Sequence, residues 1–375
     1  MNPDMWKYDG VFRRMKDDPR FHPIIIGATR NSAALDIQIQ EQRKMGEYFR
    51  GKGYEFVDGY DEKSQHWLCL RSLHPDIIFY TQPYSNGIFS GFEFPCHFNA
   101  IFCYTPYYFQ HSKSPWNWDN PLQNHCWRQY YANQYQVGIC KELSRIKGAN
   151  AIAAGYPLEE EIREIDKNKE LCDKAWHNDK RKRVIWAPHH SITKKEFFKV
   201  SSFLDICHEM VALREKYKRD VIFAFKPHPM LQAKLYQIWG KETTDSYYDD
   251  WANSENSFYA PGDYKALFCG SDALIHCCGS FLVEYHYTGK PVQYVYSKTR
   301  NPQDLGKISD LALTAHYPAH SVEDIDKFIQ QVVIDGNDPM KEVRQDFAAE
   351  YLKSPNGKMF SENVVDDILH GLGKA

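Results

Sequence analysis

The feature of this chain that most constrains its fold is a run of five apolar residues, Val221–Phe225, that stops at the polar tetrapeptide Lys226–Pro229. A short, continuously apolar segment is typical of a strand buried on both faces, as in a parallel sheet covered by helices. Open sheets of this kind bind ligands at the carboxyl ends of their strands. The run therefore predicts a parallel α/β sheet that presents Lys226 and His228 at its ligand-binding edge.

A second segment with the same organisation begins at residue 271. Residues 271–276 read as a strand, residues 277–280 as a turn of small residues, and residues 281–285 as the start of a helix. Gly279 allows close approach of a ligand, Ser280 can cap the helix, and the N–H groups of a first helical turn favour an anion such as a pyrophosphate. Glu284 lies one turn into the helix, where a carboxylate suits hydrogen bonds to ribose hydroxyls.

The two segments and their spacing resemble the family of CDP-glycerol:poly(glycerophosphate) glycerophosphotransferases, the teichoic-acid polymerases and their capsule-synthesis relatives. That family carries an Arg- or Lys-Pro-His-Pro motif, and then a segment of the form Ser-Asp-x-x-Ile-x-Asp-x-Ser-Ser with an acidic residue four positions further on. The matching positions are Lys226, Pro227, His228 and Pro229 in the first motif, and Ser271, Asp272, Ile275, Ser280 and Glu284 in the second. The sequence departs from the motif where Cys277 replaces the second Asp and Gly279 the first Ser.

The resemblance is fullest over residues 184–295 and implies a transferase of the GT-B architecture. In that α/β architecture, two Rossmann-like domains with parallel sheets face each other across a cleft. The donor nucleotide-binding residues that we expect are Pro188, Ser271, Asp272, Gly279, Ser280 and Glu284. Asp272 is expected to play a supporting structural part. Because Cys277 cannot supply the oxygen ligand that magnesium prefers, we expect no metal site and no cofactor.

Four residues at strand ends are the candidates for catalysis. An imidazole such as that of His228 can donate hydrogen bonds to the charge that builds on a departing nucleotide, and Lys226 adds a fixed positive charge. His189 and His190 follow the apolar strand at 183–188, and this position favours a functional role. Adjacent histidines also occur as ordinary polar groups of loops, so that interpretation stays open.

The length of 375 residues allows two domains of ordinary size. Predicted strands at 22–27, 54–57, 75–80, 99–104 and 149–154 alternate with helical segments at 5–20 and 32–50. They predict a Rossmann-like acceptor domain over residues 1–157. A charged connector at 158–181 opens the donor domain, residues 158–375. Its strands are predicted near 183–188, 221–225, 271–276 and 292–295, and its helices near 194–217, 322–334, 338–353 and 360–371.

The acceptor side is less defined. The family's base is a His in a Trp-His-Gly segment, and it is missing at the corresponding strand end, which reads Cys103–His111. Tyr104 and Tyr107 are candidates for the acceptor pocket, and His111 and His74 are candidates for the base, although each could be a structural residue. Aromatic residues, 15% of the chain, gather between 92 and 135. They predict either a tyrosine-rich core or a surface that faces carbohydrate or membrane.

Composition narrows the class of protein. A formal net charge of −3 gives no general attraction to nucleic acid. No apolar run approaches the roughly 18 residues of a membrane span, and the first residues do not resemble a signal peptide. Ten cysteines without the regular spacing of a secreted scaffold fit reduced thiols. We expect a cytoplasmic protein, with peripheral association at the inner face of the cell membrane left open.

The leading hypothesis is an enzyme that moves a polyol phosphate, glycerol phosphate by resemblance, from a CDP-activated donor to a glycan or lipid-linked acceptor in capsule or teichoic-acid-like synthesis. One alternative is a nucleotide-sugar glycosyltransferase or UDP-sugar 2-epimerase of the same architecture, since both also use a His-Pro strand end. The other is a non-catalytic nucleotide-binding partner that has lost the acceptor base. The polyol, the acceptor and the oligomeric state stay open.

Overall fold

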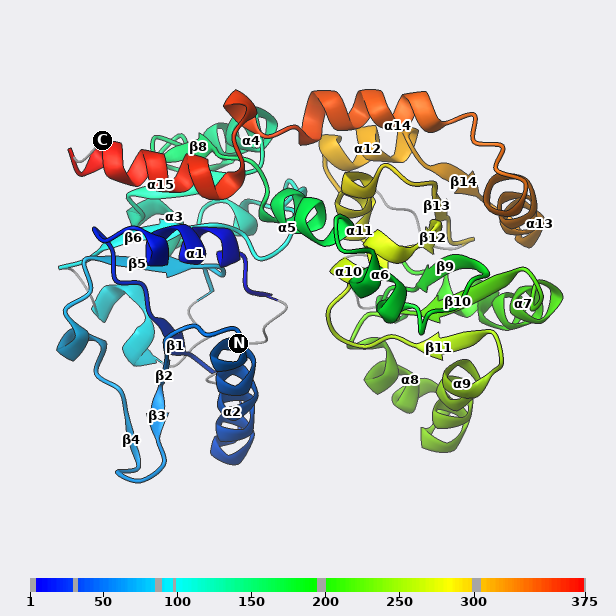
Figure 1. Cartoon of the computed structure of the whole chain (residues 1–375), viewed down its shortest axis with the longest axis horizontal. Helices are drawn as coiled ribbons and strands as arrows, with labels where there is room; N and C mark the ends of the chain where they lie inside the picture. The colour runs from blue at the N-terminus through cyan, green and yellow to red at the C-terminus, as the bar shows by residue number, and fades with distance from the viewer. Residues whose placement is uncertain are drawn as a thin grey trace. The chain divides into compact units, whose positions relative to one another are not determined.

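The chain folds into two compact units built around parallel sheets, as the sequence predicts (Figure 1). The computed structural model describes residues 5–29, 33–84, 90–96, 99–193, 200–298 and 305–373. The first unit comprises Met1–Glu160 and Lys353–Ala375, and the second comprises Glu161–Leu352. Ser32 and residues 194–199, where two of the predicted helices begin, lie outside the described residues.

The first unit contains a four-stranded parallel sheet, β5-β6-β7-β8, a two-stranded parallel sheet, β1-β2, and an antiparallel pair, β3-β4. Its strands are β1 (Ile25–Gly27), β2 (Phe56–Asp58), β3 (Tyr60–Asp61), β4 (His66–Trp67), β5 (Ile77–Tyr80), β6 (Ile101–Tyr104), β7 (Arg128–Tyr131) and β8 (Ala151–Ala153). Its helices are α1 (Asp9–Asp17), α2 (Leu35–Gly51), α3 (Pro121–His125), α4 (Gln134–Leu143) and α15 (Phe360–Gly371), and α5 (Pro157–Asp166) leads into the second unit.

Strand β7 is absent from the predicted strands because its residues do not form an apolar run. Gln129 is nevertheless fully buried, and its side-chain amide donates to Asn150 Oδ1 at 2.7 Å, so the polar group is satisfied inside the unit. Its neighbours Tyr130 and Tyr131 are 0% and 1% exposed. Much of the aromatic segment between 92 and 135 is therefore core.

Helix α15 corrects the predicted domain boundary. Residues 353–375 were expected in the second domain, but they belong to the first unit. Buried Phe360, Val364 and Ile368 of α15 share an apolar cluster with Tyr8 and Val11 at the start of the chain, and Figure 1 draws α15 beside α1. An amphipathic helix must cover an apolar surface, but its sequence does not specify which surface.

The second unit contains a six-stranded parallel sheet in the order β11-β10-β9-β12-β13-β14. Its strands are β9 (Lys182–Ala187), β10 (Val221–Phe225), β11 (Ser257–Tyr259), β12 (Ala273–His276), β13 (Val292–Val295) and β14 (Tyr317–Ala319). Its helices are α6 (Lys169–Ala175), α7 (Phe203–Lys216), α8 (Leu231–Trp239), α9 (Lys241–Asn253), α10 (Lys265–Gly270), α11 (Phe281–Glu284), α12 (Lys307–Thr314), α13 (Val322–Lys327) and α14 (Lys341–Phe347). Numbered along the chain, the strands follow the Rossmann order 3-2-1-4-5-6.

The central strands of this sheet form the core of the second unit. All five residues of β10 are buried, as are all four of β12. Val184, Phe223 and Ile275 belong to one large apolar cluster, and Ile185 and Leu274 to another. This burial matches the continuous apolar runs of the sequence. No helix among the described residues has the length and apolar character needed to cross a membrane.

The placement of α15 gives a first prediction. Ile368 is fully buried in the first unit, so Ile368→Ala is expected to lower the free energy of unfolding of that unit by about 2–5 kcal/mol. The exposed His370→Ala on the same helix is the control and should stay within about 0.5 kcal/mol of wild type. Hydrogen exchange of α1 amides measures the effect, because α1 belongs to the first unit alone. Faster exchange in the second unit with α1 unchanged would contradict the assignment.

Candidate functional site

The carboxyl ends of β9, β10 and β12 lie together in the middle of the second unit's sheet. Ala187 at the end of β9 pairs with His276 at the end of β12, and Trp186 pairs with Phe225 at the end of β10. The direction of strand order reverses between β9 and β12. In open α/β sheets this switch point is where a crevice forms and ligands bind.

Three histidines meet at this edge. His189 and His190 follow β9, and His228 follows β10, whose chain is held to β9 by the bond from the His228 N–H to the Pro188 carbonyl at 3.0 Å. The ring centroid of His190 lies 4.2 Å from that of His189 and 4.1 Å from that of His228, and the His189 and His228 centroids are 5.2 Å apart. The structure thus brings together three of the four residues proposed for catalysis.

Backbone hydrogen bonds fix the protonation pattern of two of these rings. The N–H of Ser191 donates to His189 Nδ1 at 3.2 Å, and the N–H of Met230 donates to His228 Nδ1 at 3.1 Å. A backbone N–H can only donate, so Nδ1 is the accepting nitrogen in both rings. A neutral imidazole then carries its proton on Nε2. Both histidines therefore present Nε2–H as a hydrogen-bond donor.

His190 has a charged partner that the sequence analysis missed. The ammonium of Lys234, on α8, lies 2.6 Å from His190 Nδ1, and an ammonium can also only donate. The signal in the sequence is weak, because Lys234 is simply one of several lysines on a helix that follows the His228 turn. Burial, with the neighbouring rings and Lys234, lowers the pKa of His189 well below its usual range, so His189 is neutral at pH 7.

Three histidines at this spacing could also form a binding site for a transition metal such as zinc. One ring nitrogen of each residue lies within 4.8 Å of one from each of the others. Zinc would need an unprotonated ring nitrogen from every histidine. In His189 and His228 the Nδ1 lone pair accepts a backbone N–H and Nε2 carries the proton, so neither ring has a nitrogen available for a metal. The positive charge of Lys234 beside His190 also repels a cation. The arrangement fits an anion such as a pyrophosphate better than a metal ion.

The turn at 277–280 is tied to β9 by its two cysteines. The N–H of His189 donates to Cys277 Sγ at 3.4 Å, and the Cys278 thiol donates to the Ala187 carbonyl at 3.0 Å. Ser280 occupies the N-cap position of α11, but its side chain makes no capping hydrogen bond. Helix α11 is only four residues long, so the expected anion site at a helix start is weaker than predicted. Gly279 lies in the same turn.

Lys226 and Glu284 frame the same edge. The Lys226 ammonium donates to the carbonyls of Ala260 at 3.1 Å and Gly262 at 2.6 Å, so it anchors the loop after β11. Glu284 is 2% exposed, and its Oε2 accepts the Tyr264 hydroxyl at 2.8 Å. The sequence analysis did not identify Tyr264. Lys226 therefore shapes the wall of the site in addition to contributing charge.

Ser271 and Asp272 are placed away from the histidines. Both precede β12, whose four residues separate its two ends by about 13 Å. The Ser271 hydroxyl donates to the Phe268 carbonyl at 2.8 Å, and Asp272 Oδ2 accepts the N–H of Arg183 at 2.8 Å. They join β12 to its neighbours at the amino edge of the sheet, a position that speaks against their assignment to donor binding, which stays a prediction. The structural part expected of Asp272 agrees with this position.

The residues expected on the acceptor side lie in the first unit. Tyr104 ends β6 and is 1% exposed, Tyr107 is partly buried, and His111 is 6% exposed. Burial, and next the nearby Tyr84, raises the pKa of Tyr107 to about 12. His74 precedes β5, at the opposite edge of the sheet from Tyr104. Of the two candidate bases, His111 alone follows the carboxyl end of a strand, and its role as base stays a prediction.

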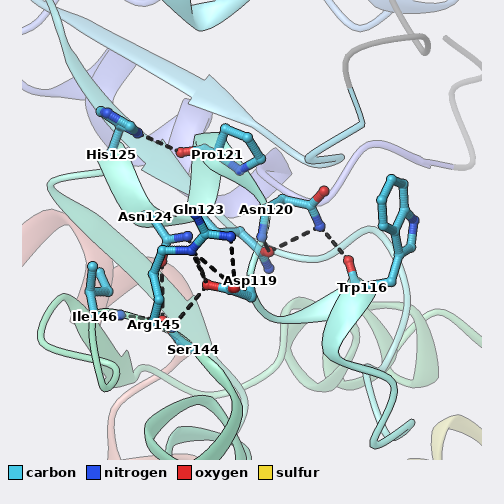
Figure 2. A network of polar contacts seen from close by, with 10 residues as sticks. All are labelled: Trp116, Asp119, Asn120, Pro121, Gln123, Asn124, His125, Ser144, Arg145 and Ile146. Atoms are coloured by element: carbon cyan, nitrogen blue, oxygen red, sulfur yellow. Dashed lines mark hydrogen bonds and ion pairs between the residues drawn. The ribbon is translucent and has the colours of Figure 1, made fainter.

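An exposed tryptophan near these tyrosines is held by a polar network (Figure 2). The Trp116 ring is 69% exposed and stacks on that of Tyr84, with centroids 6.3 Å apart and planes 9° apart. The side-chain amide of Asn120 donates to the Trp116 carbonyl. Arg145 donates to both carboxylate oxygens of Asp119, which lowers the pKa of that carboxyl to about 2. Trp116 is therefore an exposed aromatic residue in the 3-10 helix Pro115–Asn117, whose backbone is hydrogen-bonded to Asn120.

Comparisons with known proteins bear on the whole chain. The sequence model of the family described as CDP-glycerol:poly(glycerophosphate) glycerophosphotransferase matches residues 110–370. A structure of the wall teichoic acid polymerase TagF soaked with CDPG is similar, with a TM-score of 0.59 and 12% identity over 98% of this chain and 86% of that chain. MnaA of S. aureus, determined with UDP, gives a TM-score of 0.57 and 12% identity over 100% of this chain and 95% of that chain.

A putative UDP-N-acetylglucosamine 2-epimerase from Listeria monocytogenes is similar to the same degree, with a TM-score of 0.58 and 12% identity over 100% of this chain and 95% of that chain. At these identities the structural likeness shows a shared fold. Among curated protein sequences, none matches the chain.

The protonation pattern gives a prediction for His228. In His228→Asn the amide oxygen can still accept the Met230 N–H, but the donor at the Nε2 position is lost. In His228→Gln that donor is kept. We expect His228→Asn and His228→Ala to lower the catalytic rate by about 100-fold or more, and His228→Gln to lose clearly less. Steady-state kinetics with far-ultraviolet circular dichroism as a folding check decides it. An unchanged rate in folded His228→Ala would remove His228 from the site.

Proposed function

The chain belongs to the CDP-glycerol:poly(glycerophosphate) glycerophosphotransferase family, because the model of that family matches residues 110–370, and we propose that it transfers a polyol phosphate from a CDP-activated donor to a glycan or lipid-linked acceptor. Family membership makes it a transferase of the glycerophosphotransferase type in teichoic-acid-like synthesis. We propose three further points: that the polyol is glycerol, that the acceptor is a glycan or lipid-linked molecule, and that single residues have the roles given below.

The observation that carries the proposal is the meeting of His189, His190 and His228 at the switch point of a Rossmann-type sheet. Hydrogen-bond donors and a nearby lysine suit the pyrophosphate of a nucleoside diphosphate. Glu284, oriented by the Tyr264 hydroxyl, is our candidate for the ribose hydroxyls. TagF, which has the same fold, was studied with CDPG, and a cytidine diphosphate donor is therefore proposed here as well.

The proposed chemistry is an in-line displacement at the β-phosphorus. An acceptor hydroxyl oxygen forms a bond to that phosphorus, and the bond from the phosphorus to the bridging oxygen breaks. CMP leaves with the electron pair, and the acceptor proton passes to a base, with His111 as the candidate in this chain. The Nε2–H groups of His189 and His228 stabilise the charge that develops on the departing phosphate.

The alternatives are less well supported. The 2-epimerase and glycosyltransferase hypothesis rests on a shared fold, since MnaA and TagF resemble this chain equally. The family match favours the glycerophosphotransferase. The hypothesis of a non-catalytic partner does not explain why three histidines meet at the ligand-binding edge of the sheet. We propose that the reaction takes place in the cytoplasm, on an acceptor at the inner face of the membrane.

Donor chemistry gives the direct test of the function. We expect CDP to raise the melting temperature more than UDP does, and we expect CMP to be released from CDP-glycerol when an acceptor is supplied. Because protein groups can neutralise the pyrophosphate, turnover should continue in EDTA. Release of UDP or formation of an epimer from a UDP-sugar would support the epimerase or glycosyltransferase hypothesis instead. Loss of turnover in EDTA with recovery on adding magnesium would contradict the metal-free scheme.

Proton uptake gives a second test. In the free protein the pKa of His189 lies below its usual value. A bound pyrophosphate would raise this pKa, since an opposite charge favours the imidazolium. In the imidazolium Nδ1 no longer accepts the Ser191 N–H and instead donates to the Ser191 hydroxyl, 2.9 Å away. Binding should therefore take up a proton between the two pKa values, and CDP affinity should rise as pH falls toward that range.

Calorimetry at pH 6.5 in buffers of different ionisation enthalpy measures this uptake. The phosphate of CDP also titrates, so His189→Gln, which keeps a neutral donor that does not titrate, is the control. The proton uptake of wild type should exceed that of the variant. Equal uptake in the two proteins would place the pyrophosphate away from His189.

A further inference from the structure

A second group of three histidines lies buried behind the turn at 277–280. His276 ends β12, His286 lies in the 3-10 helix Tyr285–Thr288, and His316 precedes β14. They are 0%, 1% and 2% exposed. The family motif specifies no residue at position 276, and the proposed function gives these side chains no part. One of them, His276, is nevertheless hydrogen-bonded to the turn that carries Gly279 and Ser280, and the others are linked to His276 through His316.

The hydrogen bonds give the ring protons of His276 and His316 definite places. The Cys278 N–H donates to His276 Nδ1 at 3.1 Å. His316 Nδ1 lies 2.7 Å from the Ala312 carbonyl, which can only accept, so His316 carries its proton on Nδ1 and accepts at Nε2. His276 Nε2 lies 3.1 Å from His316 Nε2 and is therefore the donor. The chain of donors runs from Cys278 through His276 and His316 to Ala312.

This direction holds only while the rings are neutral. Burial lowers the pKa of His276 well below its usual range and that of His316 to about 4. The guanidinium of Arg344, on α14, is 1% exposed and paired with Asp338, and its charge lowers the pKa of His286 and His316 further. The other titratable ring packed on His276 is that of Tyr294, 5.3 Å away. Near neutral pH the protons are therefore fixed.

We propose that His276 is a positioning residue for donor binding, which sets the conformation of the turn at 277–280 by accepting the Cys278 N–H, and that His316 selects the tautomer of His276 that can do so. The proposal rests on the proposed function of that turn. The coupling to the site is short: Cys278 follows Cys277, whose sulfur accepts the N–H of His189. A turn that is not held at Cys278 would displace Gly279 and the backbone of His189 together.

Two substitutions of His276 test its two hydrogen bonds separately, the one from Cys278 and the one to His316. In His276→Asn the amide oxygen stands near the position of Nδ1 and keeps the bond from Cys278, but the link to His316 is lost. In His276→Gln the amide nitrogen keeps the link to His316, and the acceptor for Cys278 is lost. We expect His276→Gln to raise the KM for the CDP-activated donor about tenfold, with a smaller change in kcat, and His276→Asn to stay within about threefold of wild type.

His286→Gln is the matched control. His286 is equally buried in the same group, but its Nε2 lies 3.3 Å from His316 Nδ1 and its ring packs on Phe347, on the side of His316 away from the link between His276 and Cys278 in the hydrogen-bond chain. We expect it to lower the melting temperature by an amount similar to that of the His276 variants, with the donor KM unchanged. The proposal is overturned if His276→Gln and His276→Asn raise KM equally, or if His286→Gln raises KM as much as His276→Gln does.

A spectroscopic measurement tests the chain of donors without nucleotide. Nitrogen NMR of wild-type protein labelled at histidine should show His276 protonated at Nε2 and His316 protonated at Nδ1 at pH 7. The reverse tautomer of His276 would overturn the proposal even if His276→Gln fails to fold. If the tautomers are as expected but the wild type neither binds CDP nor releases CMP, the proposed function fails, and with it the positioning role that rests on it.

Discussion

The register between β9 and its two neighbours is the constraint on which the site depends. Parallel strands all end at the same edge, so pairing Ala187 with His276 and Trp186 with Phe225 brings together three loops that lie far apart in the sequence. A shift of β9 by one residue would turn its side chains to the opposite faces of the sheet and break both the core and the site. The buried apolar residues of β9, β10 and β12 thus set the geometry of the polar groups that follow them.

Hydrogen-bond donors around the histidines decide what the cluster can bind. A neutral imidazole has one donor nitrogen and one acceptor nitrogen, and the backbone N–H groups of Ser191 and Met230 make Nδ1 the acceptor and Nε2 the donor in His189 and His228. The buried group at His276 follows the same rule in the opposite sense, because there a carbonyl at Ala312 fixes the protons. In both groups local backbone geometry controls the chemistry of imidazole, and burial lowers the pKa of His189, His276 and His316 so that these rings stay neutral.

Sequence reasoning identified the parts of this protein that depend on local patterns. The apolar runs that became β9, β10 and β12 were predicted, as were the histidines that follow β9 and β10. The contacts that depend on distant packing were not. Lys234 beside His190, and His316 beside His276 across 40 residues, involve ordinary residues that have no motif.

Three differences between the predictions and the structure have equally physical causes. Ser271 and Asp272 match the family motif, but a match in sequence does not show at which end of a strand a side chain acts. Helix α15 was assigned to the wrong unit because its apolar face would fit any apolar surface. Strand β7 was missed because Gln129 is buried with its amide satisfied by Asn150, a compensation that only the folded chain reveals.

Because α15 packs in the first unit, the two units can complete their cores at different times during synthesis. Phe360 and Ile368 complete a cluster begun by Tyr8 and Val11, so the first unit cannot finish its core until residues 360–368 leave the ribosome. At about 5–20 residues per second, the intervening second unit delays that moment by roughly 10–40 s. The second unit, which is continuous in sequence, can close during that time. A ribosome that stalls before residue 360 would therefore hold a chain whose second unit can be complete while the first unit still lacks the α15 residues of its apolar cluster.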